Sequence, residues 1–385
     1  MYQIKEINKK LNYVILFTIA VGVSSRILIS TYGFNVDMEY WRLFADVIKY
    51  NGPIYEVGMN YGPVWAYLLY FLDQIPFFIE GEIESLRYKI TIFLTLIDLL
   101  IFITIIKIHS LKIGILFFLN PVSIFITGFH SQFDNLAVFI GLLAILIYEK
   151  NKKNIGFYIC SIVLSISLII KHILLILPIW LAVKEKKFDR KIFIISIPVV
   201  LFLISFIPFV DNYTLIYDHV LNYKSSQNGI FWKIFTPQFF GTYLGYNFLF
   251  LVTLFILSLF FEKEDKIKTY YLYLISIALF SPSIANQYLA IPIVAIAFFW
   301  NRFFFLYTVA CCLFFLVDFT ALNIEYIKDM VGWTRNTTRI GYKIIIIFLA
   351  LGFVQTIVSK EKFDLFFRNI IVYFYNKIKN QFLLK

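Results

Sequence analysis

Long apolar runs alternate along the chain with short basic connections, a pattern that predicts a bundle of membrane-spanning helices. The runs cover residues 12–31, 88–107, 113–129, 135–149, 155–170, 172–183, 192–210, 246–261, 269–284, 287–300, 303–319 and 341–359. Because a membrane helix needs about 20 mostly apolar residues, we predict an all-α polytopic membrane protein of about twelve spans (11–13). We expect the whole chain, 1–385, to form a single membrane domain.

The segment 62–79 leaves the number of spans open. It is apolar but is interrupted by Asp73, Gln74 and Pro76. Treating it as a full span would move the basic cluster of residues 184–191 to the outer side, so we expect a re-entrant or interfacial segment, which requires protein or water around its irregular backbone. A count of thirteen spans stays open as the alternative.

The first outer loop carries a second periodicity, which is typical of a short amphipathic helix. Apolar residues recur at helical spacing opposite a polar face. The apolar residues are Met38, Trp41, Phe44, Ala45 and Ile48, and the polar ones are Glu39, Arg42, Asp46 and Lys49. We expect this helix to lie on the membrane surface.

Composition agrees with the membrane class. The chain is 60% hydrophobic and only 15% charged, with a mean hydropathy of +0.79, which is too little polar surface for a soluble globule of this length. The three cysteines lie in apolar runs without metal-ligand spacing, so no zinc site or disulfide is indicated. No other cofactor is indicated, and only a divalent metal is left open.

The net charge of +11 indicates topology and not nucleic-acid binding, because the basic residues fall in every second connection. They are Lys5, Lys9, Lys10, Lys107, Lys112, Lys150, Lys152, Lys153, Lys184, Lys186, Lys187, Arg190, Lys191, Lys263, Lys266, Lys268 and the tail from Lys360. Basic loops stay in the cytoplasm. We therefore predict a multi-pass cell-membrane protein with both termini cytoplasmic.

With that orientation, four polar clusters lie at the outer face. They are 35–39, 130–135, Lys171 with His172, and 283–287. Asp37 could act as a general base there, or it could cap the following helix; the sequence does not separate the two. His130, Gln132, Asp134 and Asn135 offer donors, acceptors and amides that suit a hydroxyl-rich ligand, and a polar turn capping two helices is the alternative.

Lys171 follows an apolar run and has no acidic neighbour in sequence. An unpaired cation at this depth is costly, so an anionic ligand such as a lipid phosphate is the natural partner; snorkelling to the headgroups is the alternative. Asn286, Gln287 and Tyr288 break another apolar run, where they could orient a sugar or simply form a tight turn.

These segments, taken in order, resemble the GT-C class of integral-membrane glycosyltransferases. They are similar in particular to dolichyl-phosphate-glucose α-1,3-glucosyltransferases and to prokaryotic relatives of a GPI mannosyltransferase. Asp37 looks like the family's loop aspartate, and the stretch 60–67, which contains Tyr61, looks like its Tyr-Pro-Pro-x-x-Ala-Tyr stretch. Asn120-Pro121 and the 130–135 cluster look like the family's Asn-Pro and the His-x-Gln-Tyr-Asn that follows it.

The resemblance also includes 97–100 and 171–173 and covers most of residues 30–185. It implies a GT-C-like catalytic module over 1–210 and more variable C-terminal helices over 211–385. Two departures stand out: Asp134 is inserted within the best motif, and Asn286-Gln287 stand where the family has His-Glu.

The resemblance implies transfer of a hexose, such as mannose or glucose, from a polyprenyl-phosphate donor to a lipid-linked glycan or other acceptor on the outer face, with inversion. Asp37 would be the base, and Lys171 with His172 would stabilise the phosphate leaving group. The donor and acceptor sites would draw on Tyr61, His130, Gln132, Asp134, Asn135, Asn286, Gln287 and Tyr288. The expected partners are these two substrates and membrane lipid.

Two other functions compete with this enzyme. A transporter or flippase of lipid-linked sugars would place its polar residues near the membrane midplane and show paired repeats, and no paired repeat is apparent. A polysaccharide polymerase would be expected to carry paired arginines in large outer loops, whereas 211–245 contains no arginine.

Overall fold

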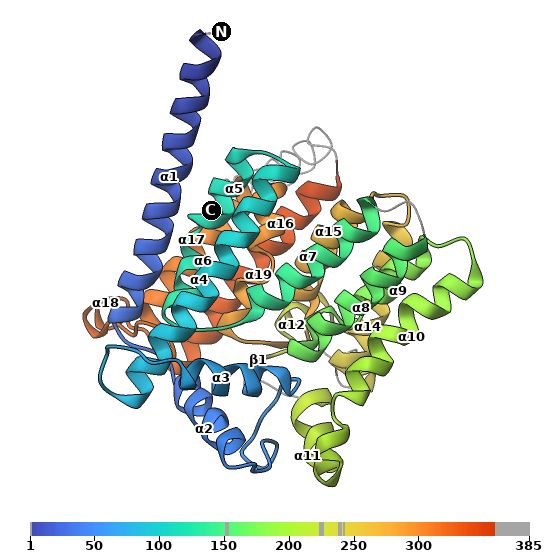
Figure 1. Ribbon diagram of the computed structural model, residues 1–385, viewed down its shortest axis with the longest axis horizontal. Helices are drawn as coiled ribbons and strands as arrows, with labels where there is room; N and C mark the ends of the chain where they lie inside the picture. Colours follow the sequence, from blue (N-terminus) through green and yellow to red (C-terminus); the bar gives the residue numbers. More distant parts are fainter. Residues whose placement is uncertain (1, 151–153, 223–226, 238–240, 242, 359–385) are drawn as a thin grey trace, which may run out of the picture.

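The chain folds into a bundle of helices in the computed structural model (Figure 1). The structure describes all residues except 1, 151–153, 223–226, 238–240, 242 and 359–385. Strands are confined, within this described part, to one antiparallel pair of two residues each, β1 (Gln227–Asn228) and β2 (Ser283–Ile284). The predicted helical fold is confirmed.

The helices of the first half are α1 (Tyr2–Thr31), α2 (Asp37–Lys49), α3 (Val64–Gln74), α4 (Glu82–Ile108), α5 (Leu111–Phe118), α6 (Pro121–Gly128), α7 (Asp134–Lys150), α8 (Asn154–Ile170), η1 (His172–Leu174) and α9 (Leu177–Val183). Those of the second half are α10 (Phe188–Ile204), η2 (Ile207–Asn212), α11 (Tyr213–Ile216), η3 (Tyr217–Leu221), α12 (Ile230–Phe235), α14 (Tyr246–Phe260), α15 (Lys266–Phe280), η4 (Asn286–Leu289), α16 (Ile293–Phe298), α17 (Arg302–Val317), α18 (Glu325–Met330) and α19 (Arg335–Ile357).

Three of the described helices are long and apolar enough to cross a membrane: Leu11–Thr31, Glu82–Ile108 and Asn336–Ile357. Two bent pairs raise the number to five if each pair is one span: α5 with α6, bent by 47°, and α10 with Ile207–Leu221, bent by 68°. Other predicted runs form apolar helices of 10–17 residues. The chain is therefore a helical membrane protein, and the predicted number of twelve spans is not confirmed.

The first bent pair has a local cause. α5 ends at Phe118, and two residues later Asn120 caps α6, its side chain accepting the backbone N–H of Val122 at 3.0 Å. Pro121 occupies the first position of α6, where its missing N–H costs nothing. The predicted run 113–129 is thus broken in two at an Asn-Pro pair.

The segment 62–79 holds α3, which has only 11 residues. At 1.5 Å per residue such a helix is about 16 Å long, roughly half the thickness of the hydrocarbon core. It cannot cross alone, so the structure does not support a thirteenth span here. Together with α2 it lies at the end of the bundle opposite the N-terminus (Figure 1).

The apolar side of α2 packs against protein. Met38, Trp41, Phe44 and Ala45 are buried, and the Trp41 ring meets the Trp65 ring of α3 edge-on at 5.8 Å. The hydrophobic face that the sequence indicated is therefore used to dock α2 onto the bundle. Its position on the membrane surface stays a prediction.

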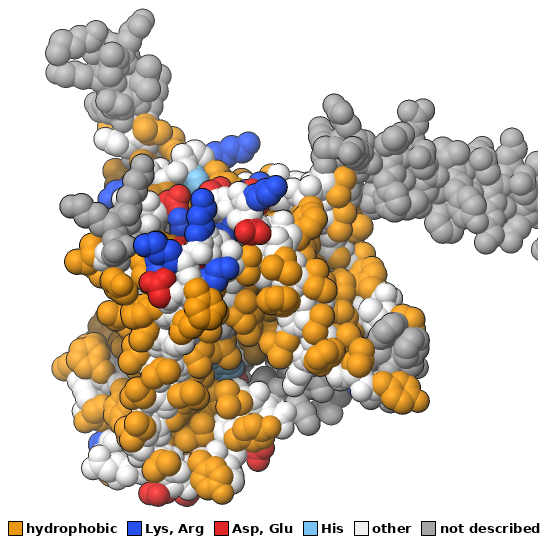
Figure 2. Space-filling view, turned by 90° about the vertical axis from the view of Figure 1, so that its right-hand side faces the viewer, with side chains coloured by type: hydrophobic (Ala, Val, Ile, Leu, Met, Phe, Trp, Pro, Cys, Tyr) orange, Lys and Arg blue, Asp and Glu red, His pale blue; other side chains and the backbone are white. Residues whose placement is uncertain are grey.

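The end of α7 and the connections that precede α10 and α15, all predicted to be cytoplasmic, lie together at the other end of the bundle. The Lys184 ammonium donates to the carbonyls of Phe261, Glu262 and Glu264 at 2.7–2.8 Å, and Lys266 of α15 bonds Glu149 of α7 at 3.2 Å. Figure 2 shows basic side chains gathered near one end of this face, above a broad apolar surface. This asymmetry agrees with the predicted topology, although which end faces the cytoplasm stays a prediction.

Candidate active site

Three segments far apart in sequence converge near the start of α2: the α6–α7 connection, the stretch before α3, and the residues that follow α8. Gly62 explains one close approach, because a Cβ atom there would lie 1.7 Å from the carbonyl oxygen of Ile169. Only glycine lets the Tyr61 loop pass against the end of α8, two residues before Lys171. Ser131 in the α6–α7 connection has a φ of 52°, a left-handed conformation uncommon outside glycine.

Asp37 is held by two side-chain amides. Its Oδ2 accepts hydrogen bonds from Gln132 Nε2 at 2.5 Å and from Asn35 Nδ2 at 3.0 Å. The residue that precedes α2 is Val36, and no side-chain cap is formed there. The alternative in which Asp37 caps the helix is therefore not observed: the carboxylate is bonded by side chains from two different segments.

Asn35 was not among the site residues predicted from the sequence. Its Nδ2 lies 2.7 Å from His130 Nδ1 as well as 3.0 Å from Asp37 Oδ2, and its Oδ1 accepts the backbone N–H of Asp37 at 2.9 Å. The sequence signal for it was its place in the polar cluster 35–39, two residues before Asp37. Asn35 thus connects His130 to the carboxylate.

Lys171 has an acidic partner, which corrects the expectation that it is unpaired in the protein. Its Nζ lies 2.7 Å from Asp134 Oδ2, and the two side chains are 1% and 0% exposed. Asp134 is the residue that departs from the family motif, and it lies 37 positions before the lysine. The insertion therefore supplies the counter-charge of Lys171.

Aromatic rings surround the Lys171 ammonium. Its Nζ lies 4.8 Å from the ring centre of Tyr61, 4.7 Å from that of Phe133 and 5.9 Å from that of Tyr288. The faces of aromatic rings attract a cation and exclude water from it. The ammonium is therefore held in place by one carboxylate and several ring faces.

Electrostatics separate the roles of Asp37 and His130. Burial raises the pKa of Asp37 above its ordinary value, while the hydrogen bond from Asn35 and the charge of Lys171 act in the opposite direction. Burial lowers the pKa of His130 to about 3, so its ring is neutral at physiological pH. Asp37 is the group here whose proton affinity suits a base.

Several buried polar atoms around Asp37 and Lys171 have no hydrogen-bond partner within the described residues. They are His130 Nε2, Ser131 Oγ, Gln132 Oε1, Asp134 Oδ1 and His172 Nδ1. Buried polar atoms are almost always paired in proteins. Such a concentration at one place indicates a site where a polar ligand or water completes the hydrogen bonds.

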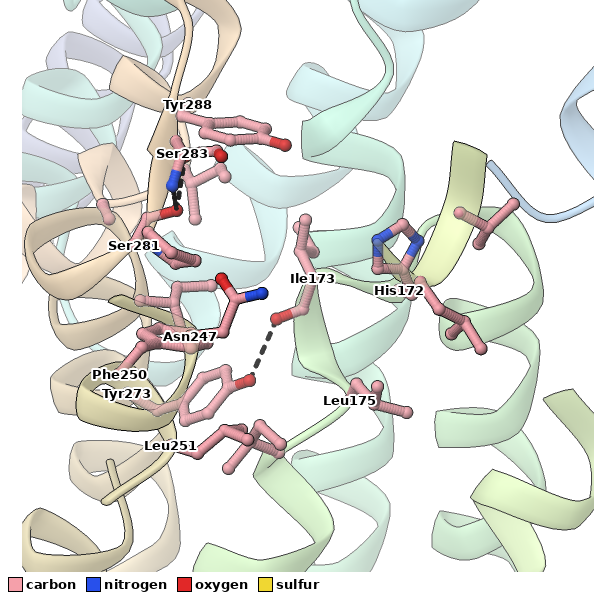
Figure 3. A pocket seen from close by; sticks show the side chains of 17 residues that line it. His172, Ile173, Leu175, Asn247, Phe250, Leu251, Tyr273, Ser281, Ser283 and Tyr288 are labelled. Carbon is pink, nitrogen blue, oxygen red and sulfur yellow. Dashed lines mark hydrogen bonds between the residues drawn. The ribbon is translucent and has the colours of Figure 1, made fainter. Parts of the chain in front are cut away.

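A mostly apolar groove of about 330 Å³ lies beside this cluster. It runs between η1, α14, α15 and η4, and Figure 3 shows Tyr288 and His172 on either side of Ile173 in its wall. Tyr288 also lies near the Lys171 ammonium. Two of the predicted ligand-binding residues therefore line an apolar groove that adjoins a buried cation.

No family model and no curated protein matches the sequence. Among solved structures, the chain is similar to the crystal structure of ArnT from Cupriavidus metallidurans in the apo state, with 11% sequence identity and a TM-score of 0.49. The match covers 89% of this chain and 76% of that chain. At this level the likeness assigns no activity to the chain.

Two predicted site residues take part in other networks. Asn135 Nδ2 donates to Asp98 Oδ1 at 2.6 Å. The Asn286 amide donates to Asp318 at 3.0 Å and accepts from the Tyr342 hydroxyl at 2.5 Å. Gln287 beside it is buried in η4. Because Asn135 and Asn286 are engaged with protein groups, we leave both out of the proposed site.

The described residues contain no group of three or more His, Cys, Asp or Glu side chains that could hold a metal ion. In the first loop, Asp46 pairs with Arg42 at 2.8 Å, and Arg42 also reaches Asp73 at 2.7 Å. The Asp46 carboxylate is therefore used in an ion pair and not directed at Asp37.

Proposed function

We propose that this protein is an integral-membrane glycosyltransferase of the GT-C type, a polyprenyl-phosphate-sugar-dependent hexosyltransferase. It moves a sugar such as mannose or glucose from a polyprenyl-phosphate donor to a lipid-linked glycan or other acceptor at the outer membrane face. The observation that carries the proposal is the half-buried Asp37 carboxylate within electrostatic reach of the buried Lys171 ammonium. Tyr288, whose ring lies 5.9 Å from that ammonium, also lines the apolar groove.

Asp37 is the proposed base. As the acceptor hydroxyl attacks the anomeric carbon, its proton passes to the carboxylate, and the bond between that carbon and the phosphate oxygen breaks. Attack opposite to the leaving group inverts the anomeric centre. A carboxylate with raised proton affinity accelerates such a step, and the pKa of Asp37 is raised by burial.

Lys171 is the proposed partner of the leaving phosphate. The oxygen that departs keeps the electron pair and gains negative charge, which a fixed cation stabilises where water is excluded. The rings of Tyr61 and Phe133 lie within 5 Å of its ammonium and limit its contact with water. Tyr288 and His172 would then border the lipid phosphate, with the isoprenoid tail in the apolar groove.

A flippase of lipid-linked sugars is the alternative. It would need a polar path through the membrane, whereas the cluster around Asp37 lies near α2 and α3 at one end of the bundle (Figure 1). The two functions differ in product, because a flippase moves its lipid unchanged and a transferase forms a new glycosidic bond.

The test is to incubate the purified protein with a panel of radiolabelled polyprenyl-phosphate sugars and membrane lipids and to identify the glycosylated product. The Asp37→Asn variant should lose transfer by a factor of about 100 to 10,000, the usual contribution of a general base, with unchanged abundance. Asp46→Asn, on the same helix but paired with Arg42, is the matched control and should retain activity.

Two outcomes would contradict the proposal. Full activity in Asp37→Asn would remove this carboxylate from the reaction. Movement of labelled lipid across liposomes without any glycosylated product would favour the flippase.

A further inference from the structure

We infer that Asn35 is a positioning residue that fixes the Asp37 carboxylate by its Oδ2 atom, so that Oδ1 takes the proton of the acceptor. The inference rests on the proposed function. Within the described residues, both hydrogen bonds to this carboxylate come from amide N–H groups, and both end on Oδ2.

The geometry explains why an amide is needed at position 35. Its Nδ2 donates to Asp37 Oδ2 at 3.0 Å, and its Oδ1 accepts the Asp37 backbone N–H at 2.9 Å. One side chain therefore holds both the main chain and the carboxylate of Asp37. The Nδ2 group also lies 2.7 Å from His130 Nδ1, so a neutral His130 ring accepts its second N–H.

Amides are suited to this role because they do not titrate. Asn35 and Gln132 can donate to the carboxylate without taking its proton, in contrast to a neighbouring acid or base. Oδ2 already accepts two hydrogen bonds. The hydroxyl of the sugar acceptor therefore donates its hydrogen bond to Oδ1. As the O–H bond of the acceptor breaks, the new O–H bond forms at Oδ1 and the charge of the carboxylate is neutralised.

The charged groups that face Asp37 are few. Lys171, after α8, favours the ionised form, and Asp134, at the start of α7, opposes it. His130 faces Asp37 only through Asn35, and with a pKa of about 3 it stays neutral above pH 5. A pH effect that lies above the titration range of His130 and responds to Asn35 therefore reports the ionisation of Asp37.

The first measurement does not depend on activity. Dicyclohexylcarbodiimide labels protonated carboxyl groups at apolar sites, and mass spectrometry of the Asp37 peptide across pH gives its titration. Removal of an amide hydrogen bond from a carboxylate destabilises the charged form, so Asn35→Ala should raise the midpoint by about one pH unit. The acid limb of the pH profile of the transfer rate should move to higher pH by the same amount.

A second variant covers a failure of Asn35→Ala to fold. Asn35→Asp keeps the acceptor for the backbone N–H and the size of the side chain, but it replaces the donor with a second carboxylate. The Asp37 midpoint should then rise further than in Asn35→Ala, since like charges disfavour ionisation.

Asn301→Ala is the matched control. Asn301 also accepts backbone N–H groups, those of Phe303 and Phe304, and its Nδ2 donates to Gly352 at 3.1 Å, so its loss tests a structural amide. It should leave both midpoints unchanged.

The outcomes separate the two proposals. Unshifted midpoints in both Asn35 variants would overturn the positioning role. A shifted labelling midpoint in a protein that forms no glycosylated product would support the positioning role of Asn35. It would at the same time contradict the proposed transferase function.

Discussion

Two ion pairs are fully buried within the described residues, and they differ in how completely their polar atoms are hydrogen-bonded. In the Arg26–Asp98 pair, Arg26 Nε lies 2.8 Å from Asp98 Oδ2, and both side chains are 0% exposed. Asp98 also accepts from Thr127 at 2.7 Å and from Asn135 at 2.6 Å. Arg26 Nη1 donates to the carbonyls of Gly22 and Phe118, and Nη2 donates to the Ser123 hydroxyl.

The Lys171–Asp134 pair is incomplete in comparison. The ammonium has three donors but makes one side-chain hydrogen bond within the described residues, to Asp134 Oδ2. Asp134 Oδ1 accepts no hydrogen bond from another described residue. A pair with all partners in place joins helices, whereas a pair with unused donors and acceptors can bind a ligand. This contrast favours a structural role for Arg26–Asp98 and a functional one for Lys171–Asp134.

Removal of Asp98 should have the largest effect on stability. Asp98→Asn leaves the Arg26 guanidinium buried without its counter-charge, and arginine cannot lose its proton in a protein. Breaking a buried pair in this way costs about 3–5 kcal/mol. Thermal unfolding in detergent should show a large fall in Tm and in membrane abundance. An unchanged Tm would remove the structural role from this pair.

Lys171→Met should affect catalysis more than folding. The remaining Asp134 can take up a proton and become neutral, so the free energy of unfolding should fall much less than in Asp98→Asn. Loss of the cation should lower kcat/KM for the lipid-phosphate donor by about 100-fold. Kinetics and Tm measured on the same preparation test this; a loss of stability equal to that of Asp98→Asn, with normal kinetics, would make the two pairs alike.

The pH dependence of transfer sharpens the functional half of the comparison. Because burial raises the pKa of Asp37, its carboxylate becomes protonated at a higher pH than an ordinary aspartate, about 3.9. The protonated form cannot act as a base, so kcat/KM should fall as the pH is lowered, with a midpoint above that value. A rate that stays constant down to pH 4 would contradict this assignment.

An exposed ion pair gives the smallest effect and calibrates the others. Lys268 lies 2.8 Å from Glu264 on the surface, and both side chains are more than a third exposed. A solvated ion pair contributes about 0–1 kcal/mol to the free energy of unfolding. Lys268→Met should therefore change neither Tm nor transfer appreciably. A fall in Tm close to that of Asp98→Asn would show that the assay reports general damage to the bundle.

The comparison also shows where sequence interpretation reached its limit. Asp37, His130, Gln132 and Lys171 were found from polar residues that interrupt apolar runs, and the structure brings all four together with Asn35 and Asp134. Lys171 was nevertheless expected to lack an acidic partner. Contacts between residues 37 positions apart depend on how helices pack, and that information is absent from local hydropathy.

The same limit applies to Asn135 and Asn286. In sequence both stand beside promising neighbours, but adjacent residues on a helix point in different directions. Asp134 therefore reaches Lys171 while Asn135 reaches Asp98, and Asn286 reaches Asp318. A polar cluster in a sequence predicts that some of its members form a site without saying which ones.

Sequence by itself determined that this chain is a helical membrane protein and where its polar segments interrupt the apolar runs, because hydrophobicity and helix periodicity are properties of neighbouring residues. The tertiary structure decided which polar groups meet: the two amides on Asp37, the partner of Lys171 and the satisfied Arg26–Asp98 pair. Hydrogen bonds and ion pairs act over about 3 Å, so only the packing of distant helices can choose their partners.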